Sequence, residues 1–233
     1  MDLKSIIEKS KRIVFFGGAG VSTASNIPDF RSQDGLYSLK YKYPPEQIIS
    51  ASFFHNNTRE FYEFYKDKMV YPDVKPNIVH KKLAQLEKEG KLSAIITQNI
   101  DNLHQLAGSK KVIELHGNVF RNYCMKCKKK YDLDYILKSD LVPTCSCGGI
   151  IKPDVVLYEE VLNDEDLKNA IYEINNCDTL IVAGTSLTVY PAASLVRYFR
   201  GNHFIIINKD KTPYDEYADL VINRPLEEVF SEI

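Results

Sequence analysis

Four of the five cysteines in this chain form two closely spaced pairs. Two residues separate Cys124 from Cys127, seventeen follow, and one residue separates Cys145 from Cys147. Zn²⁺ prefers four soft ligands in a tetrahedron, and a cysteine pair on a tight turn supplies two of them. Because four thiolates leave no open coordination position, we expect a structural zinc. Free thiols or a redox pair are the alternative, and Cys177, which stands apart, is expected in the core.

A glycine-rich turn follows an apolar run near the N-terminus. Residues 13–16 are Ile-Val-Phe-Phe, and Gly18, Ala19, Gly20 and Thr23 come directly after them. Such a turn between a strand and a helix lets the backbone approach a pyrophosphate. The pattern departs from the dinucleotide fingerprint, because Thr23 replaces the third glycine and no acidic residue follows at the usual distance. It argues against an ordinary dehydrogenase and leaves open a tight turn without a ligand.

Polar residues follow three further apolar runs along the chain. These clusters are Gln98-Asn99-Ile100-Asp101, Gly184-Thr185-Ser186 and Asn208-Lys209-Asp210. Each cluster alone could be a helix cap or a turn. In an open α/β sheet, however, ligands bind beyond the carboxyl ends of the strands. Three such clusters together with the glycine turn therefore predict a nucleotide-binding cleft.

His116 lies between a short apolar run and a glycine. A histidine can act as a general base near neutral pH, and a neighbouring glycine lets a ligand approach closely. His80 and His104 have helical settings, so we expect them to make structural hydrogen bonds. His116 is therefore the candidate base.

The elements that must position these residues alternate between β-type apolar runs and helical periodicity. Four runs are continuously apolar, as in strands buried on both faces: residues 13–16, 94–97, 179–183 and 204–207. The shorter runs 111–113 and 154–157 could add a strand or line a cleft. Helices are expected to begin at Asp2, Pro76, Asp164 and Pro191. This alternation predicts the α/β class with a parallel sheet.

Two stretches interrupt the alternation. Residues 32–75 are rich in aromatic side chains, and residues 120–153 hold the cysteine pairs. We interpret both as insertions into the sheet domain, which a chain of 233 residues is long enough to carry.

Charge and composition exclude several classes of partner. The chain has 30 Lys+Arg and 31 Asp+Glu, a net charge of −1. It therefore lacks the excess of basic residues that indicates nucleic-acid binding. No apolar stretch approaches the roughly 18–20 residues that cross a bilayer, and the N-terminus does not resemble a signal peptide. We therefore expect no membrane association and a cytoplasmic location.

Taken together, these residues resemble the sirtuin family of NAD-dependent protein-lysine deacylases. The matching segments run in family order over nearly the whole chain: residues 18–23, 27–31, 97–104, 115–118, the four cysteines and residues 184–186. The combination of Gln-Asn-Ile-Asp with His-Gly is the most specific part of the match.

The resemblance implies two domains with the substrates meeting between them. A Rossmann-like NAD-binding domain would comprise residues 1–31, 76–119 and 154–233. A smaller domain, with a helical part and a zinc module, would comprise residues 32–75 and 120–153.

The resemblance also implies roles for individual residues. The implied NAD-binding residues are Gly18, Ala19, Gly20, Thr23, Asp29, Phe30, Arg31, Gln98, Asn99, Ile100, Asp101, Gly184, Thr185, Ser186, Asn208 and Lys209. The implied catalytic residues are His116 and Asn99. The extended residues Val155, Val156, Leu157 and Tyr158 would pair with the substrate peptide as an added strand. One Zn²⁺ would bind the four cysteines.

The implied reaction consumes NAD as a co-substrate. The acyl oxygen of a modified lysine attacks the ribose carbon that bears nicotinamide, and His116 accepts a proton from the ribose hydroxyls. Hydrolysis then gives lysine, nicotinamide and O-acyl-ADP-ribose. An ADP-ribosyltransferase on the same scaffold and a non-catalytic NAD sensor are the alternatives. The partners would be acyl-lysine proteins, and the oligomeric state stays open, with a monomer compatible with the sequence.

Two segments depart from the family pattern. Tyr158-Glu159-Glu160 stands where the family usually has Phe-Gly-Glu. Tyr65 and Lys68, one helical turn apart, are similar to the Tyr-x-x-Arg pair with which one branch of the family reads acidic acyl groups, but lysine lacks the bidentate fork of arginine. The alternative is that Tyr65 packs among aromatic residues and Lys68 is solvated.

Overall fold

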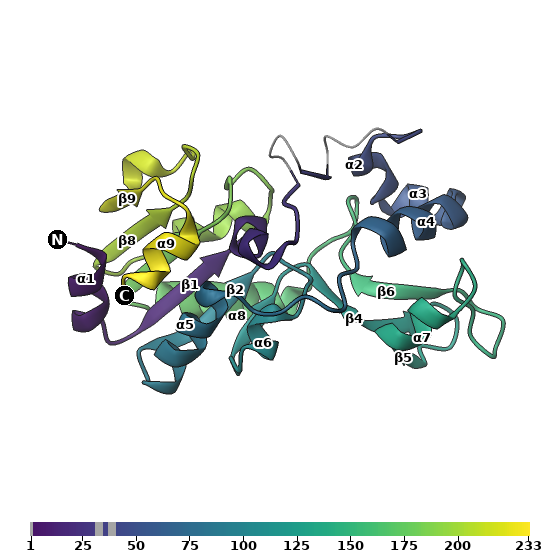
Figure 1. Cartoon of the computed structure of the whole chain (residues 1–233), viewed down its shortest axis with the longest axis horizontal. Helices are drawn as coiled ribbons and strands as arrows, with labels where there is room; N and C mark the ends of the chain where they lie inside the picture. Colours follow the sequence, from purple (N-terminus) through teal and green to yellow (C-terminus); the bar gives the residue numbers. More distant parts are fainter. Residues whose placement is uncertain (1, 31–34, 37–40) are drawn as a thin grey trace.

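The chain builds a six-stranded sheet toward one end of the molecule and a three-stranded sheet toward the other (Figure 1). The computed structural model describes residues 2–30, 35–36 and 41–233. Both termini lie at the end that carries the larger sheet. None of the helices in these ranges is long and apolar enough to cross a membrane.

The larger sheet is entirely parallel, with strand order β3-β2-β1-β7-β8-β9. The strands are β1 (Ile13–Gly17), β2 (Leu92–Thr97), β3 (Val112–Glu114), β7 (Thr179–Ala183), β8 (His203–Ile207) and β9 (Leu220–Ile222). Strand order reverses between β1 and β7, and such a reversal opens a crevice at the carboxyl ends of the strands. The predicted α/β fold with a Rossmann-like sheet is confirmed.

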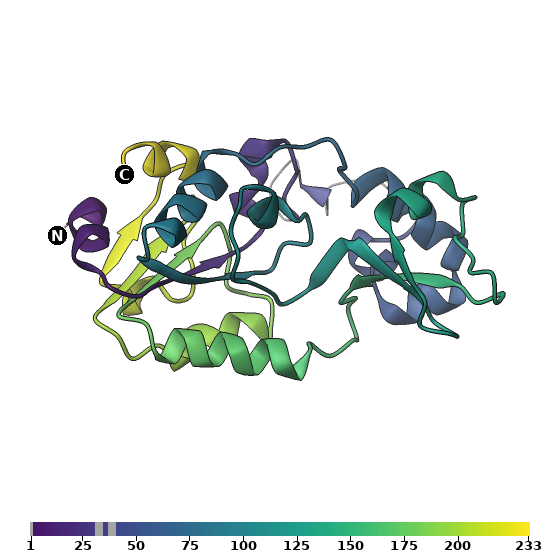
Figure 2. The ribbon, with the colours of Figure 1, turned by 90° about the horizontal axis from the view of Figure 1, so that it is seen from below.

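Helices cover both faces of this sheet, which explains why its strands are continuously apolar. On one face, α1 (Leu3–Lys9), α5 (Ile78–Lys88) and α9 (Leu226–Ser231) pack with Ile13 and Phe15. On the other face, α8 (Asp164–Asn175) and the 3₁₀ helix η4 (Ala192–Tyr198) pack with Val14 and Phe16. Figure 2 shows the two helical layers on opposite sides of the sheet.

Side-chain caps set where the helices begin. Asp2 caps α1, as expected, by accepting a hydrogen bond from the first turn. α5 begins after the N-cap Asn77 rather than at Pro76, and α8 begins after Asn163 rather than with Asp164 as its cap. In both helices an asparagine side chain accepts hydrogen bonds from free N–H groups of the first turn. Pro76 has no side-chain acceptor for this, and Asp164 is already the first residue inside its helix.

The two helical histidines differ in their hydrogen bonding. His80 completes the capping box of α5, because its Nδ1 accepts from the N–H of Asn77 at 3.3 Å. His104, in α6 (Leu103–Leu106), is buried with no hydrogen-bond partner for either ring nitrogen in the described part of the chain. Its ring packs against those of His80 and Phe15 instead. The expected structural hydrogen bonds are therefore wrong for His104.

The smaller sheet is antiparallel, with strand order β5-β4-β6. Its strands are β4 (Gly117–Cys124), β5 (Lys130–Asp132) and β6 (Ile151–Val155). The helices beside it are α2 (Pro45–Ile48), α3 (Ala51–Asn56), α4 (Thr58–Lys68) and α7 (Leu133–Lys138). A separate apolar cluster joins residues 48–70 to residues 119–157. The domain boundaries given above stay a prediction.

Candidate active site

A cavity of about 910 Å³ lies beyond the carboxyl ends of β1, β2, β7 and β8. Val155 at the end of β6 and residues 156–160 after it line the cavity from the side of the smaller sheet. This volume falls in the range of sites for small molecules and cofactors. The cavity is therefore at the position predicted for the nucleotide-binding cleft.

The glycine turn is in backbone contact with the turn that follows β7. A Cβ atom on Gly20 would lie 2.8 Å from the Cα of Gly184, and one on Gly18 would lie 2.7 Å from the Cβ of Thr185. The N–H of Gly20 donates to the carbonyl of Gly184 at 2.9 Å. These glycines are thus needed for the approach of two turns to one another. From Ala19 on, the chain forms two short 3₁₀ helices, η1 (Ala19–Val21) and η2 (Thr23–Ser25), in place of the expected helix.

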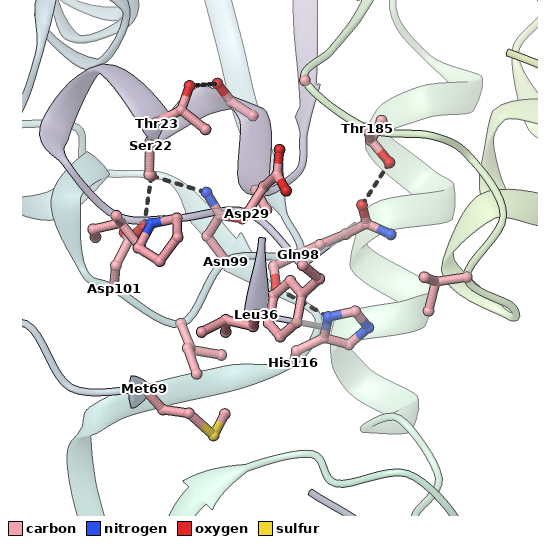
Figure 3. Close-up of a pocket in the computed structure, with 18 of the residues that line it drawn as sticks. Ser22, Thr23, Asp29, Leu36, Met69, Gln98, Asn99, Asp101, His116 and Thr185 are labelled. Carbon is pink, nitrogen blue, oxygen red and sulfur yellow. Dashed lines mark hydrogen bonds between the residues drawn. The ribbon is translucent and has the colours of Figure 1, made fainter. Parts of the chain in front are cut away.

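Ser22, which the sequence analysis did not single out, links the two loops after β1 and β2 (Figure 3). Its Oγ donates to Asp101 Oδ2 at 2.6 Å and accepts from Asn99 Nδ2 at 3.0 Å. Burial raises the pKa of the Asp101 carboxyl above its ordinary value, and hydrogen bonds from Ser22 and the N–H of Leu103 oppose that rise. The only sequence signal for Ser22 is its place in the glycine turn.

Gln98 connects the turn after β7 to the candidate base (Figure 3). Its Oε1 accepts from Thr185 Oγ1 at 2.9 Å, and its backbone carbonyl lies 2.9 Å from His116 Nδ1. Its Nε2 is buried at the cavity and has no partner among the residues that the structure describes. An unpaired buried donor is costly, so this nitrogen indicates a place for an acceptor atom of a ligand.

His116 is held as a neutral base. A carbonyl can only accept, so Nδ1 carries the hydrogen that it donates to Gln98, and Nε2 is left to take a proton. Burial lowers the pKa of His116 below its ordinary value, and the Gln98 hydrogen bond opposes part of this shift. The next residue, Gly117, has φ +78°, and a Cβ there would lie 1.9 Å from the carbonyl oxygen of Asp154. Only glycine fits there.

The four clustered cysteines satisfy the geometry of a zinc site. Their Sγ atoms lie within 4.8 Å of one another, with Cys124 to Cys147 at 3.5 Å and Cys127 to Cys145 at 3.6 Å. Zn–S bonds of about 2.3 Å in a tetrahedron give S–S separations of about 3.8 Å. The donor set therefore fits a structural zinc. Cys177 is buried in the core of the larger sheet, as expected.

Comparison with known proteins identifies the family. The Sir2 family model matches residues 18–191, which is most of the chain. The chain belongs to the Sir2 family. The resemblance to sirtuins is thereby confirmed.

Two relatives are NAD-dependent protein deacetylases. That of Clostridium acetobutylicum is 58% identical over 236 residues, covering 100% of this chain and 96% of the relative. That of Clostridium tetani is 61% identical over 226 residues, covering 95% and 92%.

Solved Sir2 structures share the whole fold. One, with a deacetylated p53 peptide and 3'-O-acetyl ADP ribose, has a TM-score of 0.90 at 42% identity, covering 99% of this chain and 96% of that one. Another, with a p53 peptide and NAD⁺, has a TM-score of 0.87 at 42% identity, covering 100% and 97%.

The structure of this Sir2 chain brings most of the predicted site residues together. Those that line the cavity are Ala19, Gly20, Thr23, Asp29, Phe30, Lys68, Gln98, Asn99, Ile100, Asp101, His116, Val155, Val156, Leu157, Tyr158, Gly184, Thr185, Ser186, Asn208 and Lys209. Gly18 does not line the cavity, because it packs under the turn after β7. Arg31 lies outside the described residues.

Tyr65 and Lys68 are not brought together as a carboxylate clamp. Tyr65 does not line the cavity; its ring stacks on Phe61 with centroids 5.7 Å apart, and it is fully buried. Lys68 does line the cavity, but its Nζ lies 3.1 Å from Asp67 Oδ2. For Tyr65 the alternative expectation, that it packs among aromatic residues, is the one that fits. The aromatic face of α4 forms part of the apolar cluster beside the smaller sheet.

Several lining residues were not predicted at all. Met69 and Tyr71 follow α4, and Arg224 and Glu227 follow β9. β9 has only three residues, so its apolar pattern is too short to mark a strand end from the sequence.

Proposed function

We propose that this chain removes acetyl groups from protein lysines, with His116 as the base, and forms nicotinamide and O-acetyl-ADP-ribose from NAD. The curated relatives are NAD-dependent protein deacetylases, and solved Sir2 structures hold a deacetylated peptide with acetyl ADP ribose. The chain is accordingly an NAD-dependent protein deacetylase. The observation that carries the residue assignment is the pairing of Gln98 with His116, which leaves Nε2 as the free basic nitrogen in the cavity.

The loops after β1 and β2 would hold the nicotinamide end of NAD. Ser22 already orients both Asn99 and Asp101 through hydrogen bonds of 3.0 and 2.6 Å. A carboxamide presents one acceptor and two donors, which side chains of this kind can match. The unpaired Nε2 of Gln98 can donate to a ribose oxygen beside them. Ala19, Gly20 and Thr23, together with Thr185 and Ser186 after β7, would lie along the phosphates and adenosine.

His116 would move a single proton. Bound NAD supplies a cationic nicotinamide leaving group, and the acyl oxygen of the lysine substrate replaces it at the ribose carbon. Nε2 then accepts the proton of a ribose hydroxyl, because Nδ1 is already committed to Gln98. A base whose pKa is lowered by burial stays neutral, and so ready to accept, at physiological pH.

The acyl group is proposed to be neutral. Asp67 pairs with Lys68 at 3.1 Å, which offsets the one ammonium that α4 places at the cavity. The Tyr65 hydroxyl is buried away from the cavity with no partner in the described ranges. A carboxylate on the acyl chain would therefore lose its hydration without gaining a clamp.

One assay tests this function. The protein is incubated with NAD and an acetyl-lysine peptide, and both nicotinamide and the mass of the peptide are measured. Deacetylation predicts equal amounts of nicotinamide and of peptide lighter by one acetyl group. ADP-ribosyl transfer predicts a heavier peptide that keeps its acetyl group, and an NAD sensor predicts no nicotinamide. Either of the last two results contradicts the proposal.

For an enzyme of this kind without a membrane-spanning helix in the described residues, we propose the cytoplasm as its location.

A further inference from the structure

A buried lysine lies beneath the segment proposed to bind the peptide. Lys152 is on β6, its side chain is only 4% exposed, and it does not line the cavity. A buried ammonium destabilises a protein unless it is paired and well hydrogen-bonded. The partners of Lys152 therefore indicate what this charge does.

Its hydrogen-bond partners in the described residues lie within residues 153–160, and the most distant of them is the carbonyl of Pro153 at 3.4 Å. Lys152 Nζ donates to the carbonyl of Val155 at 2.8 Å and to Glu160 Oε2 at 3.1 Å. The same Glu160 oxygen accepts from the N–H of Leu157 at 2.8 Å. The N–H of Glu160 in turn donates to the carbonyl of Leu157 at 3.0 Å. One ion pair thus occupies polar backbone groups on both sides of Val156.

Val156 itself joins this segment to the base. Its N–H donates to the carbonyl of His116 at 3.0 Å, and the residue lines the cavity. Within the part of the chain that the structure describes, no donor reaches the carbonyl of Val156. This carbonyl is available to an N–H of the substrate, at a position fixed relative to His116.

The neighbouring Glu159 anchors the far end of the segment. It stands where the family usually has glycine, and its φ is +75°. Its carboxylate accepts from the N–H of Ser52 at 2.8 Å and from Ser52 Oγ at 3.0 Å, at the beginning of α3. Such a backbone conformation is strained for glutamate, and these charge-assisted hydrogen bonds offset the strain.

We propose that Lys152 and Glu160 are positioning residues for the acyl-lysine peptide. By occupying the Val155 carbonyl and the Leu157 N–H, they hold residues 155–157 extended and leave the Val156 carbonyl to the substrate. Loss of the Glu160 charge leaves the Lys152 ammonium buried without its partner, and loss of Lys152 releases the partly exposed Glu160 carboxylate from the segment. In either case the segment moves relative to His116. The inference rests on the proposed deacetylase function and adds two residues that act by holding the backbone of residues 155–157.

Three single variants test the proposal. Glu160→Gln keeps the shape of the side chain, Lys152→Met removes the ammonium, and Glu173→Gln is the matched control. Glu173 is a buried carboxylate on α8, 3% exposed, that pairs with Arg12 at 2.9 Å and Lys111 at 2.5 Å. For each variant, kcat, the KM for an acetyl-lysine peptide, the KM for NAD and the melting temperature are measured.

We expect Glu160→Gln and Lys152→Met to raise the peptide KM by about tenfold or more, because small displacements of a positioned substrate are costly. The KM for NAD should stay within about twofold, since the NAD-facing loops are on other elements. The control should lower the melting temperature without raising the peptide KM. A peptide KM unchanged in folded Glu160→Gln, or raised equally in the control, overturns the proposal.

Two further measurements keep the test decisive. If Lys152→Met does not fold, Glu160→Gln decides alone. If the wild-type protein releases no nicotinamide from any acetyl peptide, the proposed function fails, and fluorescence anisotropy with a labelled acetyl-lysine peptide then tests positioning by itself. Weaker peptide binding by Glu160→Gln than by Glu173→Gln supports the role of the ion pair, and equal binding refutes it.

Discussion

At the scale of single residues, the site depends on which nitrogen of His116 carries its hydrogen. The carbonyl of Gln98 fixes that hydrogen on Nδ1, and the backbone at the next residue, Gly117, lies too close to Asp154 for any side chain. The two residues are close in space because β2 and β3 are adjacent parallel strands whose carboxyl ends meet at the same edge. The base is thus defined by a backbone group from a different strand.

Replacement of this base should abolish turnover without unfolding the protein. We expect His116→Ala to lower the rate of nicotinamide release by roughly 10²–10⁴-fold, the usual effect of removing a general base. Zinc content and melting temperature should stay close to those of the wild type, because His116 is not a zinc ligand. The measurement is nicotinamide release at saturating NAD and peptide, and near-normal turnover would refute the assignment.

The pH dependence of the rate should report the lowered pKa of His116. A base must be neutral to accept a proton, and burial moves its pKa below the ordinary 6.5. The rate should therefore persist as pH falls to 6.5 and decline only as pH falls through the lower value. A profile of kcat/KM against pH checks this, with circular dichroism at each pH to confirm folding. A decline that begins above 6.5 would contradict it.

At the scale of elements, the cysteine cluster joins strands of the smaller sheet to the loop that precedes β6. Cys124 ends β4, Cys127 follows it, and Cys145 and Cys147 lie before β6. Tyr131 on β5 donates its hydroxyl hydrogen to Cys145 Sγ at 3.0 Å. A closed four-thiolate site contributes folding free energy to the elements that it joins and takes no part in catalysis.

Removal of zinc should loosen the smaller sheet and spare the larger one. In Cys127→Ser, we expect loss of bound zinc and faster amide hydrogen exchange in β4, β5 and β6, with β1 and β7 still protected. Cys177→Ser is the matched control and should retain zinc, because Cys177 lies in the other core. Zinc analysis and hydrogen exchange by mass spectrometry measure both effects. Equal loosening of both sheets would contradict a local role.

At the scale of the whole molecule, both sheets contribute to one cavity, in which the substrates are proposed to meet. Loops after β1, β2, β7 and β8 line one side, while residues 155–160 and the end of α4 line the other. We therefore expect the choice of acyl group to depend on residues beside the smaller sheet, where Lys68 and Asp67 form a partly exposed ion pair. Such a pair contributes little to stability, so its variants should fold.

Acyl preference should follow the charge balance of this pair. We expect the wild type to act faster on acetyl-lysine than on succinyl-lysine peptides, and Lys68→Ala to leave the acetyl rate within about twofold. Asp67→Asn removes the carboxylate that competes for Lys68, so it should raise the succinyl rate relative to the acetyl rate. A panel of the two peptides with the three proteins measures this. A wild-type preference for succinyl-lysine that Lys68→Ala abolishes would support the clamp instead.

The sequence by itself determined four strands of the larger sheet (β1, β2, β7 and β8), the clustered cysteines and the family, because each depends on local pattern. Continuous apolar runs mark buried strands, and cysteine spacing follows the reach of a tight turn. The tertiary structure alone decided that Gly18 lies under a turn, that Tyr65 faces a core, that Ser22 joins Asn99 to Asp101, and that Lys152 pairs with Glu160. These roles depend on partners as far away in the sequence as Thr185 is from Gly18, and which partners meet is set by packing rather than by spacing.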